Sequence, residues 1–529
     1  MKLTYLDYAD LPFVASRDLH YIQKDPSLKP FYTYPPDLDQ FAHIIEQRQK
    51  HPVDRNLLVS TLQQQYRHRE SQPLVMERIE SLRSPQAFTV ITAHQPSLFT
   101  GPLYYIYKIL SCIRLSQLIQ ANHPEYRIIP LFILGGEDHD FAEINHLHIG
   151  DRTIRWDHPS IGGSCGRLST EGIDQCIEAV ATLLGDGTQQ ETLMHTLRQC
   201  YLGSHNYAEA TIRFLHHLFG RFGLVILNMD HSGFKMAFRK VMLDDLLQHS
   251  SSRLVPPVQK QLEDAGFPAQ AFVRDINLFY FNGNQRERIE QEGEEFILVD
   301  SLIRFSKSAM IKELEDHPER FSPNVILRPL YQETILPNLA YIGGGGELAY
   351  WLERKEQFEH YHLPFPMLVR RNSAAWLDQH AQSSLRKAGR PLQDYFTENP
   401  DDLIRDFIQD SAAIDLDYAR KQIDDLFARI QTEGEAIDAR LQFPIEGVRV
   451  RIEKYLNNLE HKMIRAEKRK QEPSISRLLH NYHILFPNST LQERYTNFLP
   501  YYGKNGPGWL DELLPYFNPL DHRFLLFEE

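Results

Sequence analysis

Four consecutive residues carry the strongest signal for chemistry in this sequence: Glu137, Asp138, His139 and Asp140. They follow an unbroken apolar run at 127–134, which has the length and composition of a buried strand. Carboxylates and an imidazole placed together can accept and donate protons near neutral pH. We therefore predict that these four residues are catalytic. Solvated loop residues and helix N-caps are the alternative interpretation of the same pattern.

Carboxylate and imidazole groups also bind metals, so a metal site at 137–140 has to be weighed. Neighbouring side chains in a loop diverge, and their spacing here is not a known metal-ligand pattern. We predict no metal site. A metal-dependent hydrolase built on the same cluster is an alternative function, and it requires a stoichiometric bound metal.

A second candidate region follows another apolar run, at 88–93, and leads into a helix. His94 and Gln95 come directly after that run, and Thr100-Gly101-Pro102 precedes the helix. Backbone N–H groups at a helix start suit a carboxylate or a phosphate, and a histidine can act as acid or base. A structural or solvated histidine is the alternative. From this region and the segment after the 137–140 cluster, we predict substrate binding by His94, Gln95, Gly101, Tyr104 and Asn145.

A third candidate region joins Arg328 to a run of four glycines at 343–346. The guanidinium of an arginine is a planar fork that matches carboxylate and phosphate, and glycines let the backbone approach a ligand closely. The run is neither a G-x-G-x-x-G fingerprint nor a P-loop. A tight strand-to-helix turn with Arg328 in an internal salt bridge is the alternative. In this region we predict substrate binding by Arg328, Gln332, Glu333, Gly343, Gly344, Glu347 and Tyr350.

The elements around these regions predict an α/β fold with a parallel sheet. The run at 88–93, a helix over 103–121 and the run at 127–134 form a strand-helix-strand unit, and further strands are expected at 224–229 and 367–371. Ligands of such sheets bind beyond the carboxyl ends of the strands, where the candidate residues lie. We predict this core over 86–375, with insertions at about 147–222 and 232–320.

The flanking segments predict three further units. Residues 1–85 mix short helical patterns with prolines and are expected to pack on the core as an extension. Apolar residues with heptad-like spacing at 423–441 and 448–463 favour two long helices packed as a coiled coil, within a helical domain over 376–485. An ordinary helical subdomain is the alternative. The aromatic-rich segment 486–529 ends in a strand-like run and is expected to return to the core.

Composition excludes several classes of protein. The formal net charge of −13 argues against a general nucleic-acid binder. The basic run at 462–470 is interpreted as a solvated helix face, with phosphate or nucleotide binding as the alternative. The four cysteines form no C-x-x-C pair, no apolar run is long enough to span a membrane, and residues 1–10 lack the pattern of a signal peptide. We therefore predict a cytoplasmic protein with reduced thiols.

Four segments together resemble the bacillithiol biosynthesis cysteine-adding enzyme family, a family of cysteine ligases. They are ITAHQPSLFTGPLYYIYKI (91–109), PLFILGGEDHDFAEINH (130–146), ERFSPNVILRPLYQETILPNLAYIGGGGELAYW (319–351) and FPNSTLQERYTNFLPYYGKNGP (486–507). They occur in the family's order and run from near the start of the chain to near its end. Many members have Gly-Gln-Gln where this chain has Ala93-His94-Gln95, which argues against an essential role for His94.

The resemblance implies a Rossmann-like core similar to class I nucleotidyltransferases, two connecting insertions, and a coiled coil that supports a homodimer. It also implies a reaction, in which the carboxyl group of L-cysteine acylates the amine of glucosaminyl malate and gives bacillithiol. No cofactor is certain. ATP is the candidate, because a carboxylate does not acylate an amine in water without activation, although the class I His-x-Gly-His motif is absent. A nucleotide-sensing coiled-coil scaffold is the alternative from a different class.

Overall fold

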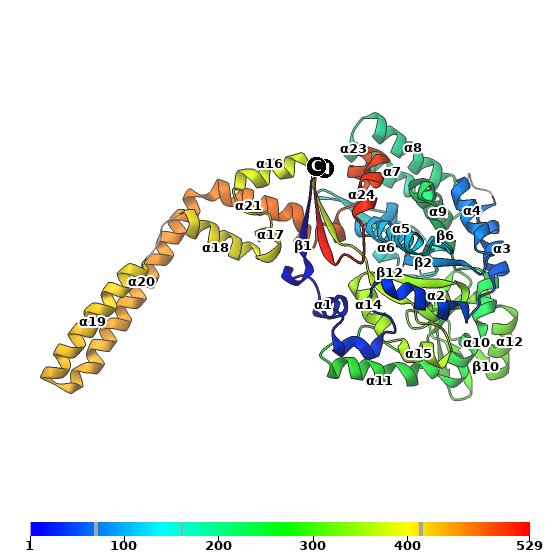
Figure 1. The fold of residues 1–529 in the computed structure, drawn as a ribbon, viewed down its shortest axis with the longest axis horizontal. Helices are drawn as coiled ribbons and strands as arrows, with labels where there is room; N and C mark the ends of the chain where they lie inside the picture. The colour runs from blue at the N-terminus through cyan, green and yellow to red at the C-terminus, as the bar shows by residue number, and fades with distance from the viewer. Residues whose placement is uncertain (1, 68–71, 160–161, 412–415) are drawn as a thin grey trace.

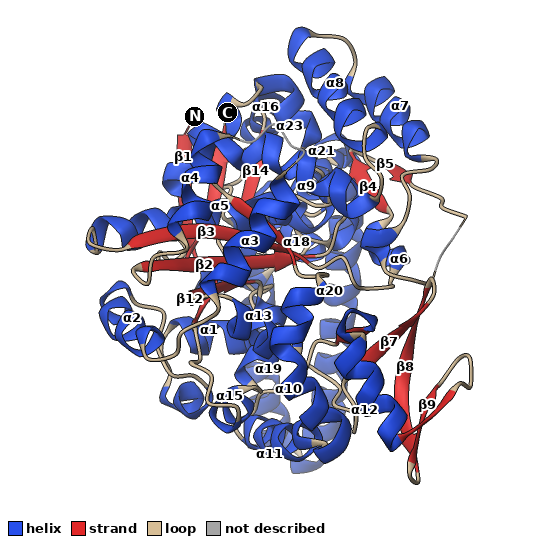
Figure 2. Ribbon diagram, turned by 90° about the vertical axis from the view of Figure 1, so that its right-hand side faces the viewer, coloured by secondary structure: helices blue, strands red, loops and turns tan. Residues whose placement is uncertain are grey.

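The centre of the molecule is a five-stranded sheet of order β13-β12-β2-β3-β6 in which every neighbouring pair is parallel. The computed structural model describes residues 2–67, 72–159, 162–411 and 416–529. The strands of the central sheet are β2 (Ala87–His94), β3 (Arg127–Leu134), β6 (Val225–Asn228), β12 (Asn338–Gly343) and β13 (Met367–Arg370). The predicted α/β, Rossmann-like core is confirmed, and Figure 2 shows β3, β2 and β12 side by side.

Alternate side chains explain why these runs form buried strands. In β3, Ile129, Leu131 and Ile133 belong to one apolar cluster, while Phe132 and Leu134 belong to another on the opposite side. A strand that faces apolar neighbours on both sides has no polar face, so its sequence is a continuous apolar run. Helix α5 (Tyr104–Asn122) connects β2 to β3 and packs on both, as the helical pattern at 103–121 predicts.

The order of the strands indicates at which edge of the sheet a ligand is expected to bind. From β2 the chain proceeds to β3 and then β6 on one side, and later returns to add β12 and β13 on the other. In open α/β sheets the crevice at such a reversal of strand order lies outside the carboxyl ends of the strands. His94, Gly135 and Gly344 lie at the carboxyl ends of β2, β3 and β12.

Two insertions interrupt the sheet. The first contains the hairpin of β4 (His146–Ile149) and β5 (Arg152–Arg155) and three helices, α7 (Ile173–Leu184), α8 (Thr188–Leu202) and α9 (Tyr207–Phe219). The second contains three helices, α10 (Ser232–Gln248), α11 (Ser250–Asp264) and α12 (Lys307–Asp316). It also contains an antiparallel sheet of order β10-β9-β8-β7-β11. Its strands are β7 (Leu278–Asn282), β8 (Gln285–Glu292), β9 (Glu295–Leu298), β10 (Arg304–Ser306) and β11 (Phe321–Pro323).

The two ends of the chain meet in a small third sheet. Strand β1 (Lys2–Asp7) pairs antiparallel with β15 (Arg523–Glu528), and β14 (Ala374–Leu377) pairs parallel with β15. Helices α1 (Ser16–Ile22), α2 (Phe41–Gln49), α3 (Arg55–Tyr66) and α4 (Pro73–Ser81) follow β1. Helices α22 (Gln492–Tyr495), α23 (Leu499–Asn505) and α24 (Gly508–Leu513) precede β15. The carboxyl-terminal segment therefore lies against the core.

Helices α19 (Asp417–Ile437) and α20 (Gln442–Lys470) form a long hairpin that projects away from the rest of the molecule (Figure 1). At its base lie α16 (Gln379–Ala388), α17 (Asp394–Thr397), α18 (Pro400–Ser411) and α21 (Glu472–Leu485). The predicted pair of long coiled-coil helices is confirmed. The two helices are separated at 438–441, and Pro444 lies in the first turn of α20, where a missing N–H is tolerated.

Most heptad positions lie outside the contact between the two helices of this hairpin. Phe427 and Gly434 are the buried residues of α19, and a Cβ on Gly434 would collide with Ile445 of α20. Leu426, Ile430 and Leu459, which belong to the predicted stripe, are exposed. Most of the predicted apolar stripe therefore stays uncovered within one copy of the chain. None of the helices in the described part of the chain combines the length and apolar character needed to span a lipid bilayer.

Candidate active site

A cavity of about 600 Å³ opens at the carboxyl ends of β2, β3 and β12. Its size is typical of a site for small molecules. Most of the residues predicted to form a site line it: His94, Gln95, Tyr104, Asp138, His139, Arg328, Gln332, Gly344, Glu347 and Tyr350. The cavity thus brings the three candidate regions of the sequence together at the edge of the sheet where the fold predicts a ligand.

Asp138 presents an ionised carboxylate to the cavity. Its Oδ2 accepts a hydrogen bond from Gln95 Nε2 at 2.8 Å, and its Oδ1 accepts one from the backbone N–H of His139 at 2.8 Å. Burial by itself would raise the pKa of Asp138, but hydrogen bonding from His139 and Gln95 and the charges of Arg328 and Arg286 hold that pKa well below its usual range. Such a carboxylate attracts an ammonium group and is a weak proton acceptor.

Arg286 was missed in the sequence analysis, because it reaches the cavity from β8 of the second insertion. Its Nη1 lies 3.6 Å from Asp138 Oδ1 and donates to His139 Nδ1 at 3.0 Å, and its guanidinium stacks 3.8 Å from the centre of the Phe279 ring. A guanidinium only donates hydrogen bonds, so His139 Nδ1 is the acceptor and its ring proton lies on Nε2. Arg286 thereby fixes both Asp138 and His139.

Arg328 and Gln332 face the cavity from one side of helix α13 (Arg328–Ile335), four residues apart. Within the described residues, the guanidinium of Arg328 makes no hydrogen bond and no ion pair, although its charge acts on Asp138. The internal salt bridge weighed from the sequence is therefore not formed among these residues. An unpaired guanidinium in a cavity is suited to bind the carboxylate or phosphate of a ligand.

His94 and Tyr104 form a pair on the wall of the cavity. His94 Nδ1 lies 3.0 Å from the carbonyl oxygen of Gln95, which can only accept, so Nδ1 carries the proton. His94 Nε2 consequently accepts from the Tyr104 hydroxyl at 2.9 Å. Burial, reinforced by the charge of Lys108, lowers the pKa of His94 to about 4, so the ring is neutral at physiological pH. His94 orients Tyr104 and carries no charge of its own.

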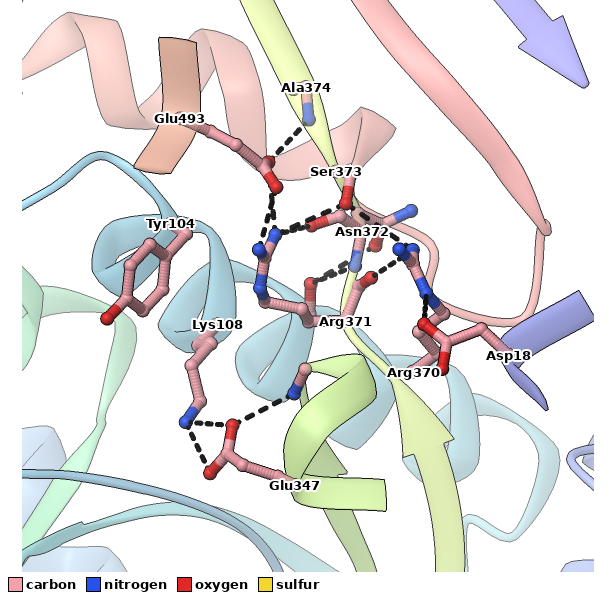
Figure 3. A network of polar contacts seen from close by, with 12 residues as sticks. Asp18, Tyr104, Lys108, Glu347, Arg370, Arg371, Asn372, Ser373, Ala374 and Glu493 are labelled. Carbon is pink, nitrogen blue, oxygen red and sulfur yellow. Dashed lines mark hydrogen bonds and ion pairs between the residues drawn. The ribbon is translucent and has the colours of Figure 1, made fainter. Parts of the chain in front are cut away.

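The carboxylate of Glu347 is bound by other groups of the protein (Figure 3). Lys108 Nζ lies 2.7 and 2.9 Å from its two oxygens, Tyr341 donates at 2.6 Å, and the backbone N–H of Gly344 donates at 2.9 Å. Burial opposes its ionisation, but Lys108 and these hydrogen bonds keep the pKa of Glu347 below its usual value. Glu347 thus holds the glycine loop in place at the start of α14 (Gly345–Leu352).

Close packing explains a glycine in that loop. A Cβ on Gly345 would overlap the carboxylate of Asp18 in α1, which itself accepts a hydrogen bond from Arg370 at 2.8 Å. Gly345 and Gly346 line the cavity in the first turn of α14, where backbone N–H groups lack partners within the helix. The loop therefore presents backbone donors to a ligand.

The remaining predicted site residues lie outside the cavity lining. Glu137 is buried and paired with Lys235, whereas Asp140 is exposed before α6 (Phe141–Ile144). Gly101, with a φ of 60°, accepts a hydrogen bond at its carbonyl from Asn497 Nδ2 at 2.5 Å. Asn145 is buried and accepts at its carbonyl from the backbone N–H of Trp156 at 2.7 Å.

Glu333 and Gly343 complete this group. Gly343 ends β12 with its backbone in the sheet. Glu333 is buried, where it accepts a hydrogen bond from Asn338 at 2.7 Å and lies 4.0 Å from Arg48. Burial raises the pKa of Glu333 to about 7. These contacts support the fold behind the cavity.

Three other charged residues line the cavity from places that local patterns do not reveal. Glu143 follows the 137–140 cluster, Arg371 follows β13, and Arg494 lies in α22 of the carboxyl-terminal segment. Arg371 is paired with buried Glu493, at 2.7 and 3.0 Å (Figure 3). The run of four letters that makes up α22 is too short to predict its position against the sheet.

Cysteine chemistry of the protein itself is suppressed by burial. Cys112, Cys165, Cys176 and Cys200 are buried, and burial raises the pKa of the first two thiols to about 12 and of the other two to about 11. The thiolate is the reactive form of cysteine, so these side chains are inert at neutral pH. Among the described residues, no group of three or more His, Cys, Asp or Glu side chains could hold a metal ion.

Comparison with known proteins agrees with this architecture. Residues 1–372 match the family model of the N-terminal Rossmann-like domain of bacillithiol biosynthesis BshC, and residues 374–529 match that of its C-terminal coiled-coil domain. The chain is 34% identical to a relative from Flavobacterium psychrophilum over 100% of both chains. It is 36% identical to one from Flavobacterium johnsoniae over 95% of each chain, and 34% identical to one from Christiangramia forsetii over 99% of this chain and 98% of the relative. All three relatives bear the name "Putative cysteine ligase BshC".

Proposed function

This chain belongs to the bacillithiol biosynthesis BshC family of ligases, and from that premise we propose that it joins L-cysteine to the amine of glucosaminyl malate, forming bacillithiol. The family resemblance seen in the four sequence motifs is confirmed by the matches over the whole chain. The substrates and the way in which cysteine is activated are the parts that we propose.

One observation supports this proposal most directly. A single cavity holds an ionised carboxylate, Asp138, and a guanidinium without a protein partner, Arg328. Both substrates carry an ammonium group and at least one carboxylate at neutral pH, so the cavity complements them in charge. Asp138 attracts the ammonium of the amino sugar, and Arg328 beside it holds the carboxylate of cysteine, which places the two reacting groups next to each other.

Glu143 is the group best suited to take the proton of the attacking amine. Glu137 is occupied by Lys235, and the strongly lowered pKa of Asp138 makes it a weak base. Burial and the neighbouring charges of Asp140 and Asp138 raise the pKa of Glu143, which lines the same cavity. A base is most effective when its pKa lies close to the working pH. We therefore assign proton removal to Glu143 and ammonium binding to Asp138.

Activation of the cysteine carboxylate is proposed to use ATP, which supplies a leaving group for acyl transfer. The residues present fit a phosphate, because Gly345 and Gly346 line the cavity at a helix start, where backbone N–H groups lack partners within the helix. These groups would bind the phosphates and orient them.

We further propose that the protein works in the cytoplasm as a homodimer formed through the hairpin of α19 and α20. The hairpin exposes the heptad stripe that includes Leu426, Ile430 and Leu459, which its own two helices leave uncovered. A second copy offers the same stripe, and self-complementary apolar faces are what a symmetric dimer requires.

The proposed reaction is tested by incubating the purified protein with L-cysteine and glucosaminyl malate, with and without ATP, and analysing the product by mass spectrometry. We expect bacillithiol with ATP and a cysteine-dependent exchange of pyrophosphate into ATP. Formation of bacillithiol without any exchange of pyrophosphate into ATP would exclude adenylation of cysteine, but it would still support the ligase assignment. No product under either condition would overturn the proposed reaction.

A further inference from the structure

Arg494 reaches the cavity from a part of the chain that the central sheet does not contain. It lies in α22, one turn of helix that precedes the final strand, and it lines the same cavity as Asp138 and Arg328. The carboxyl-terminal segment is therefore part of the candidate active site.

The residues on either side of Arg494 are firmly held. Glu493 accepts two hydrogen bonds from buried Arg371, at 2.7 and 3.0 Å, and one from the backbone N–H of Ala374 at 2.9 Å (Figure 3). Tyr495 stacks on His148 with ring centres 3.9 Å apart and planes within 9°. These contacts fix the backbone of Arg494 from both directions.

Gln492 and Asn497 extend this frame. Gln492 forms paired hydrogen bonds with the backbone of Trp376, at 2.7 and 2.9 Å. Asn497 donates to the carbonyl oxygens of Phe99 and Gly101, at 3.2 and 2.5 Å, in the loop that leads from β2 into α5. The segment is thus tied both to the third sheet and to the loop beside Tyr104.

Arg494 itself has no such partner. Its side chain is exposed, and within the described residues it makes no hydrogen bond and no ion pair. Two other arginines of the cavity are already occupied, Arg371 by Glu493 and Arg286 by Asp138 and His139. The backbone of Arg494 is held from both sides, so an anion that binds its unpaired guanidinium has only the side chain to order.

We propose that Arg494 binds a carboxylate of the amino-sugar substrate, with the Arg371–Glu493 pair as the positioning element. This inference rests on the proposed function, and it identifies the part of the site that selects the malyl group. In our assignment Arg328, beside Asp138, serves the reacting end of the site. Arg494 lies on the Tyr104 side of the cavity, because Arg371, which binds the adjacent Glu493, lies 5.2 Å from the centre of the Tyr104 ring, and the carbonyl oxygen of Thr496 accepts from the backbone N–H of Leu103 at 2.8 Å. The malyl carboxylates do not react, so they occupy the position away from Asp138.

The test compares the full-length wild-type protein with R494A, R494K and the control R239A. Arg239 is an exposed arginine of α10 outside the cavity lining, so R239A removes the same charge without touching the site. Binding of L-malate and of glucosaminyl malate is measured by calorimetry, and the KM of each substrate is measured with the other one saturating.

We expect R494A to raise the KM for glucosaminyl malate and to weaken L-malate binding by about 10- to 100-fold, the usual range for one charged hydrogen-bonding group. The KM for cysteine should stay within about twofold of the wild-type value. R494K should lie between, because an ammonium retains the charge but not the fork. R239A should match the wild type.

Two results would overturn the inference while the ligase assignment survives: unchanged malate affinity in R494A, or an increase in the KM for cysteine instead. Wild-type protein that forms no product from glucosaminyl malate would overturn the proposed function itself. E493Q adds a separate readout for positioning. This variant should raise the KM for glucosaminyl malate and leave kcat near the wild-type value.

Discussion

Lys235 donates a hydrogen bond from its ammonium group to Glu137 Oε1 in the interior of the protein, where both side chains are buried. Lys235 also donates to the carbonyl oxygen of Phe321 at 2.6 Å and lies 5.5 Å from the centre of the Tyr331 ring. Glu137 therefore points into the core, while its neighbour Asp138 points into the cavity. Glu137 therefore stabilises the core and Asp138 serves the cavity, a difference between adjacent carboxylates that the sequence alone could not show.

The first prediction concerns the stability that depends on Glu137. E137Q leaves the ammonium of Lys235 without a countercharge in the core, and breaking a buried pair in this way costs about 3 to 5 kcal/mol. We expect a clearly lower Tm by scanning calorimetry. The double variant E137L/K235M removes both charges and should recover most of the lost Tm. Equal Tm values for E137Q and the wild type would contradict the pairing.

For Asp138 we expect the activity, rather than the stability, to depend on the side chain. D138N keeps the shape of the side chain and removes the charge that attracts an ammonium, so turnover should fall by at least about 100-fold. The Tm should fall less than in E137Q, because Asp138 borders the cavity, the asparagine oxygen still accepts from the backbone N–H of His139, and Gln95 can turn its own amide oxygen toward the new NH2 group. Steady-state kinetics and a melting curve on the same preparation check both parts. Near-wild-type activity in D138N would refute the role of Asp138.

Glu143 should determine the acid side of the pH profile. A general base works in its ionised form, so kcat falls as the pH drops through its pKa, and burial and nearby carboxylates raise the pKa of Glu143 above 4.5. E143Q should lower kcat by about 100-fold and abolish that acid limb. E191Q, at an exposed site on α8, serves as the control. An unchanged acid limb in E143Q would assign the base elsewhere.

The sequence predicted the strands and the edge of the sheet well because both follow from local patterns. An unbroken apolar run of eight residues, such as 127–134, is typical of a strand buried on both faces. The polar residues that follow it in the sequence must then lie at the carboxyl end of that strand. Arg286 and Arg494 could not be predicted, because no local pattern shows where their segments pack. Each lies in a polar segment far along the chain, and only the tertiary fold brings it to the cavity.

The heptad stripe shows a related limit. Spacing determined which face of α19 and α20 is apolar, but it could not tell which surface covers that face. In the folded chain Phe427 and Gly434 make the contact within the hairpin, and the stripe remains exposed.

The exposed stripe leads to a prediction about assembly. The double variant L426K/L459K places like charges on the proposed interface, so it should convert a dimer to a monomer without changing the Tm of the core. Light scattering after size-exclusion chromatography measures the mass. T432K, at an exposed polar position of α19, should remain dimeric. A monomeric wild-type protein, or a dimeric double variant, would disprove assembly through the hairpin.

Glu333 should make stability depend on pH near neutrality. Burial raises its pKa from 4.5 in the unfolded chain to about 7 in the folded one, and its Oε2 has no hydrogen-bond partner among the described residues. Because the folded pKa is the higher one, the neutral carboxyl is the form that the fold prefers. Its stabilising contribution is complete below the unfolded pKa and is lost as the pH rises through about 7.

E333Q keeps a neutral group at this position at every pH. Between about pH 5 and about pH 8, the wild type should therefore lose roughly 2 to 3 kcal/mol of unfolding free energy relative to E333Q, as the shift in pKa implies. Urea unfolding at a series of pH values measures this difference, with E315Q at an exposed position of α12 as the control. Parallel pH profiles for the wild type and E333Q would show that Glu333 is already ionised in the folded protein, held by Arg48 at 4.0 Å.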